Sequence, residues 1–311
     1  MTAAVNPDVS VVIVSFNCRE LVRECLRRVP PSLSGYTSEL IVVDNGSHDG
    51  TPDAIRTEFP HVHLMATGEN FGFAAGNNRG LKAARGRVIV FLNPDTEPAE
   101  GSLARLVEAL DADRTLGIVG PRLTYPDGAL QPSVRGYPTF GVALLVLLKL
   151  YRVSRRLPTV ARYDQRDFDY NRAQDVEQLM GACLAMPRAV VDAMKGFDER
   201  FWMWFEEVDL CLRVRQAGWR VRYCPDANVM HRLNQSTVLL HSAFLQRMYA
   251  RSLVAFFEKH HPRWQTRVLR SVSGVGVVAA RVVQAGRRLR HGTGEQYRLD
   301  AHGARVSKAL D

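Results

Sequence analysis

The feature that most constrains the fold is a regular alternation of strand-like and helix-like segments over residues 1–120. Apolar runs rich in valine and isoleucine are expected to be strands: Val9–Phe16, Glu39–Asp44, Val62–Ala66, Arg87–Leu92 and Leu116–Gly120. The segments between them have helical character: Arg19–Arg28, Thr51–Phe59, Phe73–Ala84 and Leu103–Leu110. Strands separated by helices predict an α/β fold with a mostly parallel central sheet flanked by helices. Ligands bind such sheets at the carboxyl ends of the strands.

Beyond residue 120 the pattern changes. Residues 135–166 form a basic and apolar insertion, in which Phe140–Tyr151 is a helix candidate. Regular elements then resume, with strands expected at Leu179–Met186 and Arg220–Cys224 and helices at Glu206–Gln216 and Ala243–Lys259. Residues 261–311 form a basic extension that we expect to be helical in part.

The net charge of +9 belongs to two segments rather than to the whole chain. Arg135–Arg166 holds seven Lys or Arg against one acid, and Pro262–Gly294 holds seven Arg and no acid. A basic segment attracts nucleic acid, lipid headgroups or phosphorylated substrates. Because the acidic residues of the motifs cluster at expected strand ends, a nucleic-acid-binding or scaffold protein is the disfavoured alternative.

Three features concern the cellular setting. The five cysteines are scattered without a C-x-x-C pair, which favours a reducing compartment over a zinc site. Met1–Asp8 lacks the basic start and apolar run of a secretory signal. The longest apolar run, Phe140–Leu148, ends at Lys149 and is shorter than the about 20 residues that span a bilayer. We therefore expect a cytoplasmic protein.

Two polar motifs follow expected strands. Asp44–Thr51 places an acid before a glycine-broken turn, which suits a base or ribose and leaves backbone N–H groups for phosphates. The alternative is a plain turn in which Asp44 and Asn45 cap their own loop. In Asn93-Pro94-Asp95, the carboxylate at a strand end suits a divalent cation that also grips a diphosphate, and the alternative is a proline turn.

A third motif, Phe201–Leu210, places three acids beside four aromatic residues. Desolvation and like charge would raise a carboxyl pKa there, as a general base requires. The alternative is a helix N-terminus with favourable acids, and we expect Asp209 to pair with Arg213. Glu206 and Glu207 are the better catalytic candidates. A lone histidine, His231, becomes a metal ligand only if the fold brings it near Asp95.

The order and content of these motifs resemble glycosyltransferase family 2, whose members have the GT-A fold. The resemblance covers roughly residues 9–260 and rests on Val11–Asn17, Val42–Ser47, Asn70–Gly80, Phe91–Asp95, Gly181–Cys183, Gly196–Glu199 and Phe205–Leu210. It implies that residues 1–120 form the nucleotide-sugar-binding half of a GT-A domain. Residues 121–260 would form the acceptor-binding and catalytic half, followed by the C-terminal extension.

The resemblance also implies roles for individual residues. Asp44 would hold the nucleobase, with Ser15 and Asn17 lining the nucleotide pocket. The other implied donor-binding residues come from the matching motifs: Asn45, Asn70, Gly76, Asn77, Asn93 and Asp95.

The implied chemistry is a single displacement that inverts the anomeric centre. Asp95 would coordinate Mg²⁺ or Mn²⁺ that bridges the donor diphosphate. The family's Asp-x-Asp motif begins with Asn93 here, which gives a second ligand, His231, more weight. The base would come from Glu206-Glu207, where we favour Glu207.

Within the family, the asparagine-rich segment Asn70–Gly80 and the Asn-Pro-Asp motif resemble rhamnosyltransferases, above all those that extend N-acetylglucosaminyl-diphospho-decaprenol. This implies dTDP-L-rhamnose as donor and a polyprenyl-diphosphate-GlcNAc acceptor, in making the linker between peptidoglycan and arabinogalactan. UDP-galactofuranose or UDP-GlcNAc is the alternative donor.

A lipid-linked acceptor implies work at the inner face of the cell membrane, as a peripheral protein. Phe140–Tyr151 beside Arg152, Arg155 and Arg156 would suit the membrane surface, and the alternative is a core helix. The valine- and arginine-rich tail, residues 262–311, offers a second such surface, or else a solvated or homo-oligomer contact.

Overall fold

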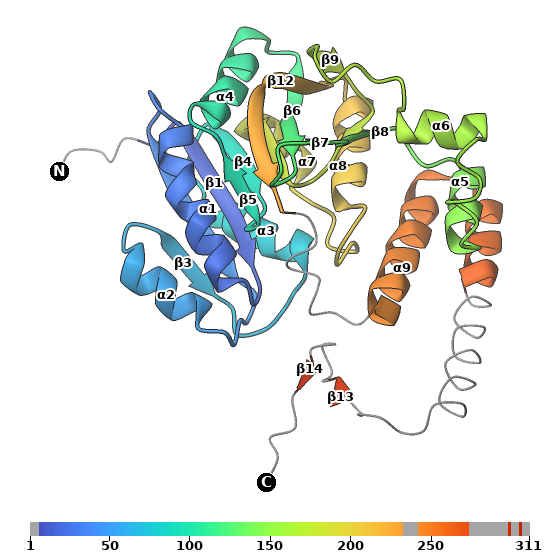
Figure 1. Cartoon of the computed structure of the whole chain (residues 1–311), viewed down its shortest axis with the longest axis horizontal. Helices are drawn as coiled ribbons and strands as arrows, with labels where there is room; N and C mark the ends of the chain where they lie inside the picture. Colours follow the sequence, from blue (N-terminus) through green and yellow to red (C-terminus); the bar gives the residue numbers. More distant parts are fainter. Residues whose placement is uncertain (1–5, 233–241, 274–297, 300–304, 307–311) are drawn as a thin grey trace.

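The computed structural model describes residues 6–232, 242–273, 298–299 and 305–306 (Figure 1). The first half alternates strands and helices as expected. Its elements are β1 (Val9–Ser15), α1 (Arg19–Ser32), β2 (Ser38–Asp44), α2 (Thr51–Glu58), β3 (His63–Ala66), α3 (Phe73–Ala83), β4 (Val88–Leu92), β5 (Thr96–Pro98), α4 (Ser102–Ala112) and β6 (Leu116–Thr124).

The second half mixes short strands with helices. Its elements are β7 (Leu130–Gln131), β8 (Val134–Arg135), α5 (Phe140–Leu147), α6 (Pro158–Asp164), β9 (Gln174–Asp175), β10 (Gln178–Leu179), β11 (Cys183–Pro187), α7 (Arg188–Met194), α8 (Glu206–Gln216), β12 (Arg220–His231), α9 (Ser242–His260), β13 (Arg298–Leu299) and β14 (Arg305–Val306). A further helix covers 263–273. The apolar and basic tail segments at 275–290 lie outside the described residues.

One central sheet joins the two halves. In the described part of the chain its order is β3-β2-β1-β4-β11-β6-β12-β5, with β7 beside β6 and β9 beside β12. Strands β3, β2, β1 and β4 are parallel, whereas β11 runs antiparallel to both β4 and β6. The α/β prediction is confirmed, with a sheet that is parallel in its first half and mixed in its second. The boundaries of the two predicted halves stay a prediction.

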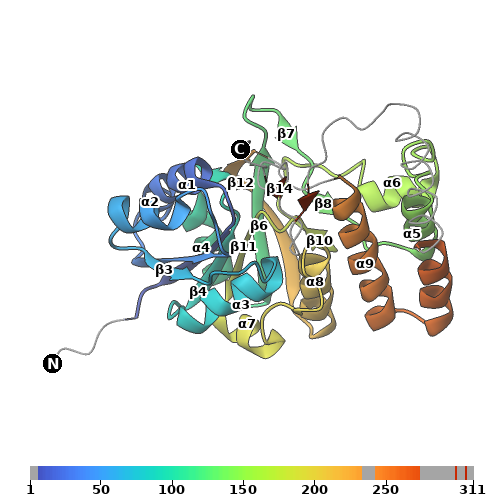
Figure 2. The ribbon, with the colours of Figure 1, turned by 90° about the horizontal axis from the view of Figure 1, so that it is seen from below.

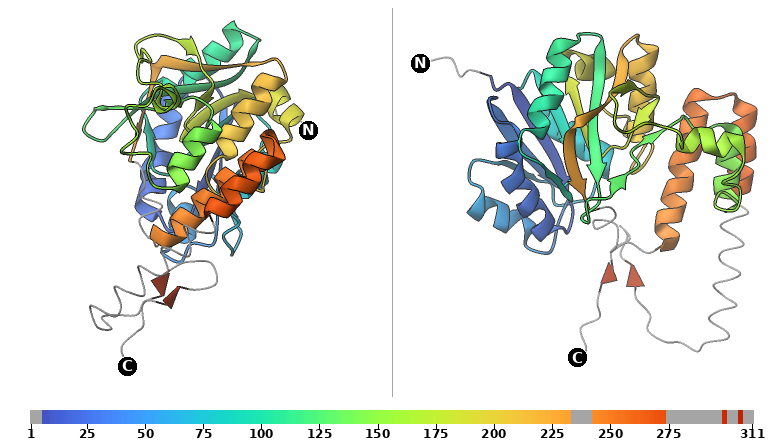
Figure 3. Two further views of the ribbon diagram at one scale, coloured as in Figure 1. Left: turned by 90° about the vertical axis from the view of Figure 1, so that its right-hand side faces the viewer. Right: turned by 45° about the horizontal axis from the view of Figure 1, so that its top comes forward.

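Helices cover both faces of the sheet (Figures 1 and 2). One buried apolar cluster packs α1, α2 and α4 against one face, and a second packs α3, α7 and α8 against the other. A third cluster joins α5, α9 and the segment before α8 into a helical layer at the end of the sheet (Figure 3). The β-branched strand residues explain the first two clusters, because β1 is buried along its whole length.

Two strand predictions were wrong in ways that matter for the site. The strand expected at Arg220–Cys224 continues to His231, because register shifts beside β6 absorb the segment that follows Cys224. The strand expected at Leu179–Met186 is divided into β10 and β11 by a break that contains Gly181. The helix expected at Phe140–Tyr151 ends at Leu147.

A buried carboxylate fastens α8 to α9. Asp209 is fully buried and accepts hydrogen bonds from Arg213 Nε at 2.7 Å and His260 Nε2 at 2.7 Å. Lys259 Nζ lies 2.6 Å from the same carboxylate. Burial alone would raise the pKa of Asp209, but the His260 hydrogen bond and the two cations hold it below its ordinary value. The predicted Asp209–Arg213 pair is confirmed.

Replacing this carboxylate should destabilise the fold strongly. In Asp209→Asn, three cationic or polar partners lose their buried counter-charge, which we expect to cost about 3–5 kcal/mol of unfolding free energy. Urea denaturation measures the loss. Asp53→Asn, which removes an exposed partner of Arg56, is the matched control and should cost less than about 1 kcal/mol. Equal losses in the two variants would show that Asp209 does not fasten α8 to α9.

Candidate active site

A cavity of about 300 Å³ opens at the carboxyl ends of the parallel strands. Ser15 ends β1, Asn45 follows β2, and Asn93 and Asp95 follow β4, so four predicted residues reach one place from three strands. Asn70, from the loop before α3, joins them. The cavity therefore lies where a parallel sheet is expected to bind its ligand.

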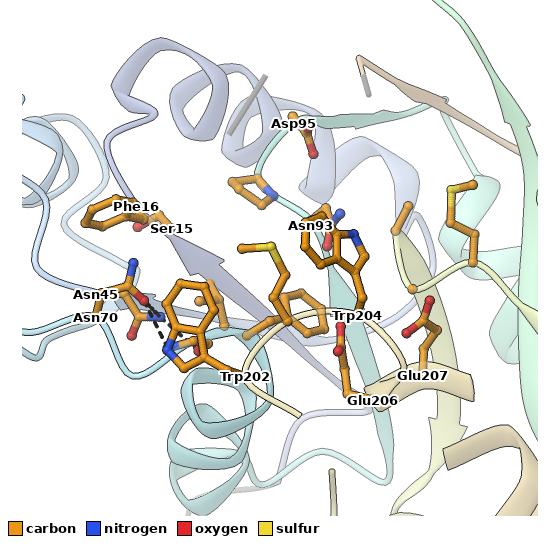
Figure 4. A pocket seen from close by; sticks show the side chains of 18 of the residues that line it. Ser15, Phe16, Asn45, Asn70, Asn93, Asp95, Trp202, Trp204, Glu206 and Glu207 are labelled. Carbon is orange, nitrogen blue, oxygen red and sulfur yellow. Dashed lines mark hydrogen bonds between the residues drawn. The ribbon is translucent and has the colours of Figure 1, made fainter. Parts of the chain in front are cut away.

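The opposite wall comes from the second half of the chain. It consists of Trp202, Met203 and Trp204 with the first turn of α8, which carries Glu206 and Glu207. Figure 4 shows the two glutamates on one side of the cavity and Asp95 on the other. The expectation that these distant acids share a cavity is confirmed.

Asp95 and His231 lie next to each other in the wall of the cavity that the strand ends form. Asp95 is 3% exposed and His231 is 4% exposed. His231 Nε2 lies 3.3 Å from Asp95 Oδ1. The pairing of β12 with β5 sets His231 opposite Thr96, one residue from Asp95. The condition under which His231 is a metal-ligand candidate is therefore met.

Gln131 fixes how the His231 ring presents its nitrogens. Gln131 Oε1 lies 2.8 Å from His231 Nδ1, and Gln131 Nε2 donates to the His231 carbonyl at 3.5 Å. With the proton on Nδ1, Nε2 turns a lone pair toward Asp95 Oδ1, which is buried and has no hydrogen-bond partner. Two acceptors that face each other across a short gap are the arrangement that a cation satisfies.

These residues fit a divalent cation only if a ligand completes its shell. Among the described residues, no group of three or more His, Cys, Asp or Glu is placed to hold a metal. Asn93 Oδ1 is a further buried oxygen without a partner beside Asp95. Mg²⁺ in proteins is commonly held by one or two carboxylates together with substrate phosphates. Asp95 and His231 thus suit a cation that is shared with a diphosphate.

The two glutamates lie at the cavity wall, where Glu206 is buried and Glu207 is partly buried. Burial and the neighbouring Glu207 carboxylate raise the pKa of Glu206 well above its ordinary value. Burial also raises the pKa of Glu207. Each has a buried Oε2 without a partner. A Cβ at Gly181 would lie 3.3 Å from Glu207 Cβ, so the glycine in the break between β10 and β11 leaves room beside this carboxyl.

The segment before α8 is strained. Trp204 and Phe205 have φ angles of 65° and 71°, in the left-handed region that bulky residues avoid at a cost of about 1–3 kcal/mol each. Tyr249 and Phe256 of α9 hold Phe205 in place, with ring centroids 5.4 and 5.7 Å away. This conformation turns Trp204 into the cavity and starts α8 with its glutamates facing the same space.

A close backbone contact connects the segment before α8 to the first half of the chain. Phe73 N donates to the Trp202 carbonyl at 2.8 Å. Gly72 has a φ of 84°, and a Cβ there would lie 2.3 Å from the Trp202 oxygen, so only glycine fits. Asn45 Nδ2 donates to the Gly72 carbonyl at 3.0 Å, which ties the strand-end asparagine to the aromatic wall.

Not every predicted donor residue reaches the cavity. The Asp44 carboxylate is buried and accepts hydrogen bonds from Ser15 Oγ at 3.0 Å, Ser47 N at 2.9 Å and Ser47 Oγ at 2.5 Å. Asn17 Oδ1 accepts from the His48 amide at 2.8 Å. Both side chains therefore serve the turn after β2, and their role in donor binding stays a prediction.

Gly76 and Asn77 also lie away from the cavity lining. A Cβ at Gly76 would lie 2.8 Å from Val14 Cγ1, so the glycine lets α3 approach β1. Asn77 is buried and donates to the Phe73 carbonyl at 3.0 Å. These contacts are packing contacts, and no donor role for the two residues is visible in them.

Gln131, Met180 and Trp204 contribute to the site without having been predicted as site residues. Gln131 and His231 are 100 positions apart in the sequence, so no local motif predicts their contact. Trp204 belongs to the aromatic run that precedes Glu206 and Glu207. That run could have predicted Trp204 as a site residue.

The sequence matches a known family. The model of glycosyl transferase family 2 matches residues 10–186. An N-acetylglucosaminyl-diphospho-decaprenol L-rhamnosyltransferase of Mycobacterium tuberculosis is 31% identical over 257 residues, which cover 77% of this chain and 82% of that protein.

Solved structures share the fold. The mannosyltransferase PcManGT of Pyrobaculum calidifontis, in complex with GDP-Man and Mn²⁺, has a TM-score of 0.54 and 21% identity, covering 93% of this chain and 77% of that one. GalNAc-T7 with UDP, GalNAc and Mn²⁺ has a TM-score of 0.52 and 16% identity, covering 83% and 52%. The predicted GT-A fold is confirmed.

The buried glutamate pair should weaken the fold at neutral pH. A raised carboxyl pKa means that the folded state holds a proton more tightly than the unfolded chain. This tighter proton binding stabilises the folded state at low pH. The stabilisation is lost as pH rises through the folded-state pKa. Glu206→Gln is neutral at every pH, so we expect its melting temperature at pH 8 to exceed that of the wild type by about 2–4 °C.

The difference should shrink as pH falls toward 4, near the ordinary glutamate pKa of about 4.5. Thermal melts over this pH range test the sign. The exposed Glu100→Gln serves as control and should change little. A lower melting temperature for Glu206→Gln at pH 8 would show that its surroundings favour the ionised carboxylate.

Proposed function

This chain belongs to glycosyltransferase family 2, and we propose that it is an inverting rhamnosyltransferase. The proposed reaction moves L-rhamnose from dTDP-L-rhamnose to a polyprenyl-diphosphate-GlcNAc acceptor, as in the synthesis of the arabinogalactan linker. One observation carries the proposal: Asp95 with His231 and the Glu206-Glu207 pair face each other across a single cavity at the strand ends.

The charge of the cavity supports a nucleoside diphosphate sugar held through a cation. Among the described residues that line it, none is Lys or Arg, while Asp95, Glu206 and Glu207 are acids. A diphosphate would be repelled there without a compensating positive charge. Asp95 and His231 would hold Mg²⁺ or Mn²⁺, which when bound supplies a Lewis acid that stabilises charge on the leaving diphosphate.

The residues of the chain divide the remaining work. Glu207 takes the proton from the acceptor hydroxyl as this oxygen attacks the anomeric carbon. Attack comes from the face opposite the diphosphate, so one displacement inverts the centre and no covalent enzyme intermediate forms. The raised pKa of Glu207 makes it a stronger base than an ordinary glutamate. Trp202 and Trp204 supply an aromatic wall that suits the methyl group of a 6-deoxy sugar.

The outer surface supports an acceptor in a membrane. The large apolar side chains exposed among the described residues gather after α5 and on the helix 263–273: Leu148, Leu150, Val153, Leu157, Trp264 and Val268. The rings of Phe140 and Trp264 pack with centroids 5.0 Å apart, which joins the start of α5 to the helix 263–273. We call this set the apolar patch. The adjacent basic residues are Lys149, Arg152, Arg155 and Arg156.

Such a patch suits the surface of an anionic bilayer. No helix of the described residues is long and apolar enough to span a membrane. Within α5, Val142 and Ala143 are buried and Ala143 belongs to the third core cluster, so α5 serves the core while the segment after it serves the surface.

Transfer assays with two site variants test the function. With radiolabelled dTDP-rhamnose and a GlcNAc-diphospho-polyprenol, Asp95→Asn should abolish turnover that depends on Mg²⁺ or Mn²⁺. Glu207→Gln should lower kcat by about 10²–10⁴-fold while dTDP-rhamnose still binds, because only the base is lost. Asp53→Asn, on the exposed side of α2, is the control. Full activity in Glu207→Gln would reject that residue as base.

The donor is tested in the same assay. Transfer from UDP-galactofuranose or UDP-GlcNAc, with none from dTDP-rhamnose, would reject the proposed donor. It would not affect the assignment to glycosyltransferase family 2.

Vesicle binding tests the apolar patch. Val153 is 80% exposed and Leu148 is 51% exposed, so Val153→Ser with Leu148→Ser should leave the fold intact. We expect binding to phosphatidylglycerol-containing vesicles to fall at least about tenfold, because each large apolar side chain contributes about 1.5–3 kcal/mol when buried. Sedimentation with vesicles measures this, with the exposed Arg172→Gln as control. Unchanged binding would contradict membrane docking by this patch.

A further inference from the structure

We propose that Arg135 and the cavity around it bind the phosphate group of the acceptor. This inference rests on the proposed function and concerns the other side of the same site. A second cavity, of about 120 Å³, adjoins the first and is lined by Arg135 together with Ser133, Tyr163, Tyr249 and Glu207.

The two cavities share a wall. Met180, Trp204 and Glu207 line both of them, whereas Asp95 and His231 line only the larger one. In an inverting displacement the acceptor hydroxyl must stand beside the base, on the side away from the leaving diphosphate. The second cavity is therefore where the acceptor sugar and the group attached to it would lie.

Arg135 brings a positive charge to this place. It lies on β8, opposite Gln178 of β10, and is partly buried. Its Nη1 donates to the Val134 carbonyl at 2.9 Å, which leaves other guanidinium N–H groups for a ligand. Within the described residues no carboxylate lies within 4.0 Å of it, and it is the one Lys or Arg that lines either cavity.

A second observation points to a polar ligand in the same cavity. Ser133 is 4% exposed, and its Oγ is buried without a hydrogen-bond partner. A buried hydroxyl without a partner costs free energy unless a ligand satisfies it. Arginine matches phosphate oxygens with paired N–H donors, and a serine hydroxyl can donate to a third oxygen. The chemistry that this set recognises is a phosphate ester beside a sugar.

The position also agrees with a lipid attached to that phosphate. Tyr163 of the cavity wall packs edge to face against Tyr151, with ring centroids 6.2 Å apart. Tyr151 lies between Leu150 and Val153 of the apolar patch. A hydrocarbon chain that leaves a phosphate at Arg135 thus has an apolar surface close by.

The test compares charged and neutral acceptors. The charged acceptor is a short-chain polyprenyl-diphosphate-GlcNAc, and the neutral one is an alkyl glycoside of GlcNAc. In Arg135→Gln we expect the KM for the charged acceptor to rise at least about tenfold, while kcat/KM for the neutral acceptor and the KM for the donor change less than about twofold. Arg135→Lys should recover part of the loss.

Arg162→Gln is the matched control, because Arg162 lies on the neighbouring α6 with its side chain 75% exposed. It should leave the KM for both acceptors unchanged. An equal loss with both acceptors in Arg135→Gln, or no loss with the charged one, would overturn the inference.

Failure of the proposed function is distinguishable from failure of this inference. If the wild type transfers no rhamnose, the proposed function fails, and calorimetric titration with the polyprenyl-diphosphate-GlcNAc still measures the contribution of Arg135. Weaker binding to Arg135→Gln than to wild type and Arg162→Gln would support the subsite in that case, and equal binding would overturn it.

Discussion

The pairing of β12 with β5 is the contact on which the first half of the site depends. It brings His231 beside Asp95 although the two are far apart in the chain, and Gln131 of β7 then fixes the ring. Without this pairing, Asp95 would be a single carboxylate on a proline turn, a weak place for a divalent cation. The bulges that let β12 continue past Cys224 are therefore part of the site as much as of the sheet.

The other half of the site depends on α9. Its Tyr249 and Phe256 hold Phe205 in a strained conformation, and its Lys259 and His260 fasten Asp209 one turn into α8. The acidic first turn of α8 is thereby kept in one position across the cavity from Asp95. Free energy spent on burying Glu206 and Glu207 is offset by packing elsewhere, which is the usual situation at an active site.

Electrostatics connects the two proposals. The larger cavity has acids and no Lys or Arg among its described lining residues, so a diphosphate there requires a cation from outside the chain. The smaller cavity has its own cation in Arg135. The same protein would thus recognise two phosphate groups by different means, one through Asp95 and His231 and the other through a guanidinium.

The sequence alone determined the α/β architecture, because β-branched runs that alternate with amphipathic segments can bury themselves in few other ways. It also determined that Ser15, Asn45, Asn93 and Asp95 would meet, since the ends of parallel strands share one sheet edge. Only the tertiary structure decided that His231 reaches Asp95 and that Arg135 lines a cavity together with Glu207. Those contacts join segments many positions apart, and no local pattern encodes the packing that brings them together.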